Sequence, residues 1–109
     1  MDDGMDEIAL IQGDALTVDG WLSLIESRED LITYPERVGT NPFTGLPVNF
    51  RPPPTTVRII RQGSDVGHIR MAEDGSNNLI VASLLEDRET TLSIAEGIAT
   101  ELQSRLIEL

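Results

Sequence analysis

All six prolines of this 109-residue chain lie between residues 35 and 54. Proline removes a backbone donor and restricts the residue before it, so no regular helix fits there. Residues 33–56 are therefore expected to form an extended, turn-punctuated loop that ends in the stiff run 52–54. Loops of this length are uncommon in small domains and are usually functional or disordered. Phe43 and Phe50 are expected to dock this loop on the core, helped by Val38, Leu46 and Val48.

The chain before this loop predicts a strand and a helix. Residues 8–12 form a short apolar run closed by Gly13-Asp14. A helix capped by Thr17 or Asp19 should follow and run to about Asp30. Its apolar face is expected to hold Val18, Trp21, Leu22 and Ile25.

The chain after the loop predicts three strands and a second helix. Residues 56–61, 66–71 and 79–84 are rich in β-branched residues and are separated by turn clusters, which indicates an antiparallel meander. Residues from about 90 to 109 place leucine, isoleucine and alanine at helical spacing. The expected fold is therefore α+β, an antiparallel sheet in the order β-α-loop-β-β-β-α with two helices packed on one face. Residues 1–7 are expected to be a disordered acidic leader, and residues 8–109 one domain.

The meander also suggests a register. If Gln62 pairs with Gly67 and Asp74 pairs with Asn77, side chains alternate between two faces of the sheet. The expected core face holds Ile60, Ile69, Met71, Ile80, Ala82 and Leu84. The opposite face is expected to hold Ile59, Arg61, His68, Arg70, Leu79, Val81 and Ser83.

Composition excludes several classes of function. The chain has no cysteine and one histidine, which argues against disulfides, a thiolate nucleophile and a zinc site. The acidic N-terminus and the lack of a long apolar run argue against a signal peptide or a membrane span, so a cytoplasmic protein is expected. A net charge of −11 and four aromatic residues argue against nucleic-acid binding.

The charge is unevenly distributed along the chain. Residues 1–36 carry a net charge of −9, residues 37–72 carry +4, and residues 73–109 carry −6. Such acidity has two interpretations: it provides solubility or adaptation to salt, or it serves to bind a protein partner with a basic surface. The expected partner-binding acids are Asp14, Asp19, Glu26, Glu29 and Asp30.

The sequence contains no complete catalytic, cofactor or metal motif. Arg61, His68 and Arg70 are the alternative site, an anion-binding face, since arginine offers a fork of donors and histidine gains charge near neutral pH. They could equally pair with the chain's own acids. His68 lacks a positioned nucleophile and an oxyanion hole, so no enzyme activity is expected. The acidic run 73–78 lacks the spacing of a calcium loop and is expected to be a turn.

The most distinctive string is Asn41-Pro42-Phe43-Thr44-Gly45-Leu46-Pro47. It predicts an Asx-type turn followed by a tight reversal that fixes Phe43. It resembles the N-P-F-T-G-x-P loop of small uncharacterised bacterial proteins, over about residues 17–54. The resemblance implies a bacterial or phage origin and a compact α+β domain, and no activity.

The general character of the chain resembles that of acidic immunity-type inhibitors, which neutralise basic bacterial toxins. We therefore expect a small acidic protein-binding domain that acts without cofactor or metal. Its negative charge is expected to speed its association with a basic partner. The alternatives are a secretion-chaperone-like dimer and a structural component of a larger viral or secretion assembly. A small-ligand or enzyme domain is the weakest alternative.

Overall fold

The computed structural model describes residues 5–50, 52–72 and 74–109, with the backbone alone at residue 50. The elements in chain order are β1 (Met5–Gln12), α1 (Val18–Ser27), β2 (Leu31–Thr33), β3 (Arg37–Thr40), β4 (Pro47–Phe50), β5 (Val57–Arg61), β6 (Ser64–Met71), β7 (Leu79–Leu84), the 3-10 turn η1 (Leu85–Asp87), α2 (Arg88–Glu101) and β8 (Arg105–Glu108). Six strands form an antiparallel sheet in the order β2-β5-β6-β7-β1-β8, and β3 pairs with β4 in a separate hairpin. The expected α+β class and the meander of β5, β6 and β7 are confirmed.

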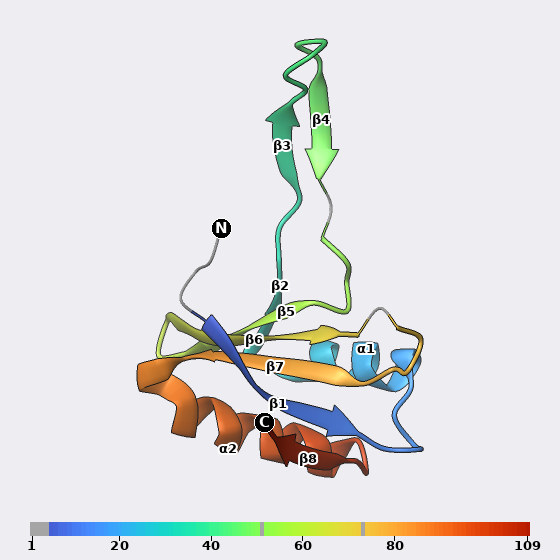
Figure 1. Cartoon of the computed structure of the whole chain (residues 1–109), viewed down its shortest axis with the longest axis vertical. Coiled ribbons are helices and arrows are strands. Elements are labelled where there is room, and N and C mark those ends of the chain that lie inside the picture. Colours follow the sequence, from blue (N-terminus) through green and yellow to red (C-terminus); the bar gives the residue numbers. More distant parts are fainter. Residues whose placement is uncertain (1–4, 51, 73) are drawn as a thin grey trace.

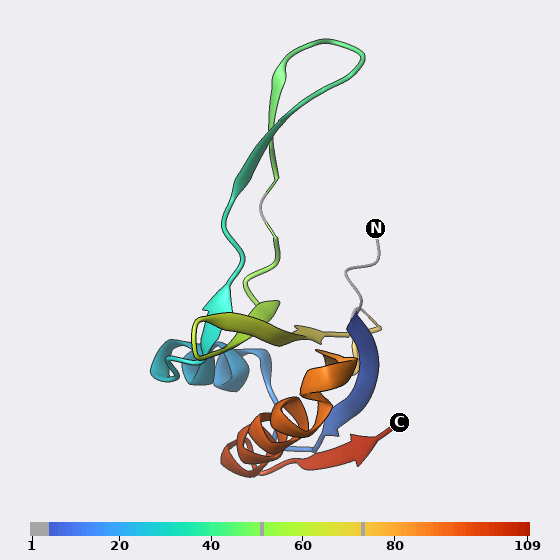
Figure 2. The same cartoon turned by 90° about the vertical axis from the view of Figure 1, so that its left-hand side faces the viewer.

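The sheet and the two helices form two layers. Both helices lie on one face of the sheet, and β1 and β8 curl around α2 (Figures 1 and 2). Between the layers lies one apolar cluster to which the sheet, α1 and α2 all contribute. Trp21 is fully buried at the centre of the α1 contribution, as its helical spacing predicts. We call the sheet face that points away from the helices the open face.

Helix α1 begins as expected and ends early. Thr17 has an extended backbone, and its hydroxyl accepts a hydrogen bond from the Gly20 N–H at 3.0 Å, so Thr17 is the cap. The helix ends at Ser27 rather than at Asp30, because the backbone is already extended at Arg28. Arg28 then binds the Asp30 carboxylate through two hydrogen bonds of 2.9 and 2.8 Å, which stabilises this turn.

The predicted register of the meander is wrong at both turns. Residues 62 and 63, both with positive φ, form a two-residue turn, so Arg61 pairs with Ser64. A β-bulge then shifts the β5–β6 register, and across the β6–β7 turn Met71 pairs with Leu79 rather than with Ile80 as expected. Each shift by one residue reverses a strand's two faces. Contrary to prediction, Ile60, Ile80, Ala82 and Leu84 lie on the open face, whereas Ile59, Arg61, Leu79, Val81 and Ser83 lie on the helix side; Ile69, Met71, His68 and Arg70 lie where expected.

Two predicted boundaries at the chain ends are also wrong. The C-terminal helix stops at Glu101 because Gln103 adopts φ +54° and the Ser104 N–H donates to the Ala99 carbonyl at 2.8 Å. The chain then forms β8 along the free edge of β1. At the other end β1 begins at Met5, so residues 5–7 belong to the sheet and not to a leader. The expected disorder of residues 1–4 lies outside the described residues.

The proline-containing segment is a projecting hairpin and not a docked loop. Its strands β3 and β4 pair from Arg37 with Phe50 to Thr40 with Pro47. Pro47 stands at the first position of its strand, where a missing donor is tolerated. We call residues 37–50 the arm. Figures 1 and 2 show it standing away from the sheet, along the longest dimension of the molecule, which is 47 Å against 30 and 25 Å.

Candidate functional site

The tip of the arm is a closely hydrogen-bonded turn. The Asn41 N–H donates to the Leu46 carbonyl, and the Gly45 N–H donates to the Asn41 carbonyl, both at 2.8 Å. The Asn41 side-chain oxygen accepts from the Phe43 N–H at 2.8 Å, which is the predicted Asx turn. Gly45 has φ +72°, a conformation that favours glycine. The tip therefore holds Phe43 in a defined position.

Apolar side chains of the arm point into solvent. The exposed fraction is 95% for Phe43, 72% for Val38 and 63% for Leu46. The prediction that Phe43 docks on the core is therefore wrong, and the side chain of Phe50 lies outside the described residues. Scattered exposed apolar residues are ordinary on a surface, but an aromatic and two aliphatic residues gathered on one projecting element are typical of a binding site.

The stem of the arm is anchored on the body at both sides. On the return side, the Trp21 indole Nε1–H donates to the Thr55 carbonyl at 2.8 Å. On the outgoing side, the Arg58 guanidinium lies over the Tyr34 ring, 5.5 Å from its centroid. These contacts connect the arm to helix α1 and to strand β5 of the sheet. The sequence pattern alone identified Trp21 as a core residue but did not indicate this second role.

Four of the five predicted partner-binding acids are available. Asp14, Asp19, Glu26 and Glu29 are exposed and form no ion pair with any described residue. The fifth acid is Asp30, which the structure binds to Arg28 instead. Hydrogen bonds from Arg28 hold the pKa of the Asp30 carboxyl below its ordinary value. The free acids on and beside α1 thus form an acidic surface without Asp30.

The alternative anion-binding face is not assembled. His68 and Arg70 lie on the open face, whereas Arg61 lies on the helix side at the end of its strand. Arg70 is already engaged, since its guanidinium donates to the Glu7 carboxylate at 2.7 Å. Within residues 5–50, 52–72 and 74–109, no group of three or more acidic or histidine side chains could hold a metal ion.

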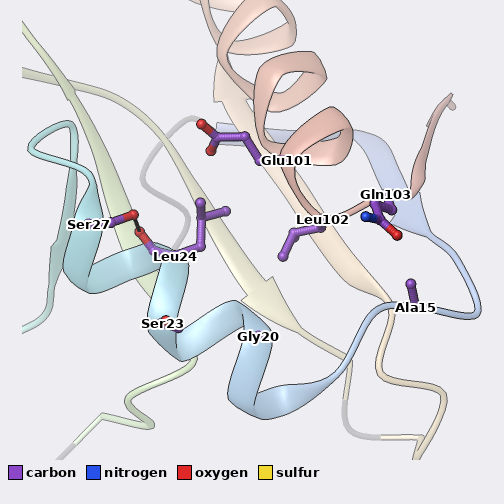
Figure 3. Close-up of a pocket in the computed structure, with 8 residues that line it drawn as sticks. All are labelled: Ala15, Gly20, Ser23, Leu24, Ser27, Glu101, Leu102 and Gln103. Carbon is purple, nitrogen blue, oxygen red and sulfur yellow. Dashed lines mark hydrogen bonds between the residues drawn. The ribbon is translucent and has the colours of Figure 1, made fainter.

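A shallow groove of about 390 Å³ separates α1 from the end of α2. Leu24 and Leu102 project into it, and small side chains of α1 form one wall (Figure 3). Its one ionisable lining group, Glu101, accepts a hydrogen bond from Arg28 at 3.1 Å. The groove offers a contact surface between the two helices.

The open face of the sheet carries a short apolar row. In the β7–β1–β8 register, Ile80 pairs with Leu10, and Leu10 pairs with Ile107. Ile107 is exposed, while Leu10 and Ile80 are half-buried. No described helix covers this side of the sheet (Figure 2). The wrong register had assigned Ile80 to the core, which is why sequence reasoning missed the row.

The described helices are all too short or too polar to cross a membrane. Comparison of the chain with protein-family models, with curated proteins and with solved structures finds no match.

Proposed function

We propose that this protein is a protein-binding module without catalytic turnover, and that the arm carries the binding. The single observation that supports this most strongly is the 95% exposed side chain of Phe43 on a hydrogen-bonded tip. Burying an apolar aromatic ring of this kind in a partner's pocket removes most of its surface from water.

The arm suits binding for an energetic reason as well. A flexible loop loses conformational freedom when it binds, and this loss reduces affinity. Here Asn41 and Gly45 already hold the tip, and the stem is anchored through Thr55 and Tyr34. Aromatic residues at the centre of an interface contribute a large share of its binding energy. The arm therefore favours a component of a larger protein assembly, one of the alternatives that the sequence left open.

The acidic surface supports a second candidate, the inhibitor of a basic toxin. Asp14, Asp19, Glu26 and Glu29 lie exposed and unpaired among the described residues, so their charge is available to a partner. Such a surface would raise the association rate with a basic protein and would be screened by salt. Arm and acidic surface are separate features, so one partner need not use both.

The two candidates are separated by cross-linking and kinetics. A photo-reactive phenylalanine analogue replaces Phe43 in the native cell, and the same analogue at Leu85, which is 82% exposed on the body, is the control. The proposal predicts a protein cross-linked at position 43 and not at position 85. No cross-link at position 43 under conditions where the protein is active would contradict it.

For a partner found in this way, Glu26→Gln and Glu29→Gln test the acidic surface. The inhibitor candidate predicts that these changes slow association and that the remaining salt dependence is smaller. The assembly candidate predicts that these substitutions leave the association rate unchanged and that Phe43→Ser weakens binding instead.

A further inference from the structure

The arm is a sheet of two strands with two outer edges. Strands β3 and β4 pair only with each other, and no other described element lies beside either of them (Figures 1 and 2). A ribbon of two strands that packs on nothing is marginally stable in water, and a third strand stabilises it. An added strand pairs with the edge that offers free backbone donors and acceptors.

The hydrogen-bond pattern of the hairpin shows which backbone groups point outward. The Asn41 N–H donates to the Leu46 carbonyl at 2.8 Å, so these two residues form a hydrogen-bonded pair. Pairs along an antiparallel ladder alternate between hydrogen-bonded and non-hydrogen-bonded, so the next pair, Thr40 with Pro47, is of the second kind. The backbone groups of this pair point away from the neighbouring strand. Pro47 agrees with this pattern, because it has no N–H to donate within the ladder.

The two outer edges of the arm therefore differ. Val38 and Asn49 form the other outward-pointing pair, two residues further along. The edge of β3 offers the N–H and C=O groups of both Val38 and Thr40. The edge of β4 offers the N–H of Asn49 alone, because Pro47 lacks one, and proline is a residue that protects an edge strand from pairing. The edge of β3 is thus the one that a further strand can pair with along its length.

The side chains of the arm define the segment that fits this edge. Arg37, Gly39 and Val48 lie on one face of the arm, and Gly39 pairs with Val48. Because Gly39 has no side chain, a large apolar side chain on an added strand can reach Val48 across it. Arg37 is the one charged residue of the arm and forms no ion pair with any described residue. A carboxylate beside Arg37 would therefore meet a cation that is not yet neutralised.

We propose that an extended segment of a partner protein adds to the outer edge of β3 as a third strand of the arm. The segment carries an acidic residue beside Arg37 and a large apolar residue beside Gly39. This inference rests on the proposed function, in which the arm is the binding element. Hydrogen bonds to the backbone of Val38 and Thr40 hold the segment, and the alternate side chains select it.

Proline substitution at two opposite positions tests which edge is used. Val38→Pro removes the outward N–H of β3, and Asn49→Pro removes the outward N–H of β4 directly across from it. Neither N–H donates within the hairpin, so both variants keep its hydrogen bonds. Val38→Thr keeps the N–H and a β-branched side chain, and it controls for the loss of valine. Each change is combined with the photo-reactive analogue at position 43 in the native cell.

The expected result is a loss of cross-linking in one variant alone. Val38→Pro should weaken binding by about tenfold or more, measured as the yield of cross-linked product at equal protein level, because the partner's carbonyl opposite residue 38 loses its donor. Asn49→Pro and Val38→Thr should leave the yield unchanged. Slow exchange of the Asn41 amide hydrogen shows that the arm of each variant is folded. A folded Val38→Pro variant that cross-links normally, or an equal loss in Asn49→Pro, would overturn the inference.

Hydrogen exchange of the unaltered chain is a second measurement that needs no substitution. The Val38 and Thr40 amides should exchange rapidly in the isolated protein, because they point into solvent. They should exchange slowly in the complex with the protein that is cross-linked at position 43, while the Asn49 amide exchanges rapidly in both. Rapid exchange of the Val38 and Thr40 amides in that complex would overturn the added strand.

This failure is distinct from failure of the proposed function. A complex that forms through position 43 but leaves the β3 amides in solvent keeps the arm as the binding element and loses only the added strand. A chain with no protein cross-linked at position 43 loses both.

Discussion

Replacing Trp21 by phenylalanine tests how the arm is joined to the core. Trp21 is fully buried, and its indole N–H donates to the Thr55 carbonyl at 2.8 Å. The substitution removes this hydrogen bond, a loss of about 1 kcal/mol, and leaves a gap where part of the ring stood, a loss of roughly 1 to 2 kcal/mol more. The free energy of unfolding should therefore fall by about 2 to 3 kcal/mol, and Trp21→Ala should lower it by roughly 3 to 5 kcal/mol.

Urea unfolding followed by circular dichroism measures both losses. Val18→Ala in the same helix is the control, because Val18 is 39% exposed, and its expected change is within about 0.5 kcal/mol. The residue after Thr55 is Thr56, whose amide donates a hydrogen bond to the Pro53 carbonyl at 3.0 Å in the stem of the arm. Hydrogen exchange at Thr56 should accelerate in Trp21→Phe. A loss below about 0.5 kcal/mol with unchanged exchange would refute the anchoring role of Trp21.

Four further substitutions test the packing and the ion pair. Gly67→Ala should destabilise the fold by about 1 to 3 kcal/mol in the same urea assay, because a Cβ there would lie 2.4 Å from the Ala82 carbonyl oxygen. Gly97→Ala in α2 is the matched control. Its added Cβ meets nothing within 4 Å, so the change should be neutral or stabilising by up to about 1 kcal/mol. Thr91→Val should lower the melting temperature and reduce the free energy of unfolding by about 1 to 3 kcal/mol. The buried Thr91 hydroxyl donates to the Val66 carbonyl at 3.2 Å and accepts from the Ser83 hydroxyl at 2.9 Å, and valine can make neither hydrogen bond. Equal stability of the two proteins would show that these hydrogen bonds contribute nothing. Asp30→Asn should destabilise the protein at neutral pH, and the difference from the unaltered chain should vanish in acid. The hydrogen bonds from Arg28 lower the pKa of the Asp30 carboxyl in the folded protein. The stabilisation from this ion pair is therefore complete above the ordinary pKa of about 3.9 and is lost as the pH falls through the lower folded-state pKa. A difference in stability that persists at low pH would contradict this.

The elements that could be predicted from the sequence are those with a local signal. Trp21 and Ile25 recur at helical spacing after a capping Thr17, and the burial of both follows from that spacing. The meander strands are rich in β-branched residues between clear turns. Such signals depend on near neighbours in the chain and are little affected by the rest of the fold.

The features that could not be predicted depend on partners far along the chain. The leucines at 102, 106 and 109 fit a helix by spacing, but the free edge of β1 provides backbone pairing that makes a strand the better arrangement for residues 105–108. The bulge in β6 changes which side chains reach the core, and no single residue in the sequence indicates where it occurs.

The candidate site shows the same division. The Asx turn at Asn41 was visible in the sequence, because the asparagine side chain caps its own turn. Whether Phe43 then docks or projects depends on the direction of the stem, which the contacts at Tyr34 and Thr55 set. The alternating residues of β3 and β4 on either side of Gly45 were the signal for a hairpin, and the concentration of prolines concealed it.

The account's central claim is that the tip of the arm is covered by another molecule when the protein associates. The direct measurement is iodide quenching of tryptophan fluorescence in a Phe43→Trp variant, recorded for the isolated protein and again after addition of the partner that is cross-linked at position 43. Trp21 is fully buried and contributes a constant background. The account predicts that the new indole is accessible to iodide in the isolated protein and becomes shielded, with blue-shifted emission, in the complex. Equal accessibility with and without the partner would contradict the claim that the arm carries the binding.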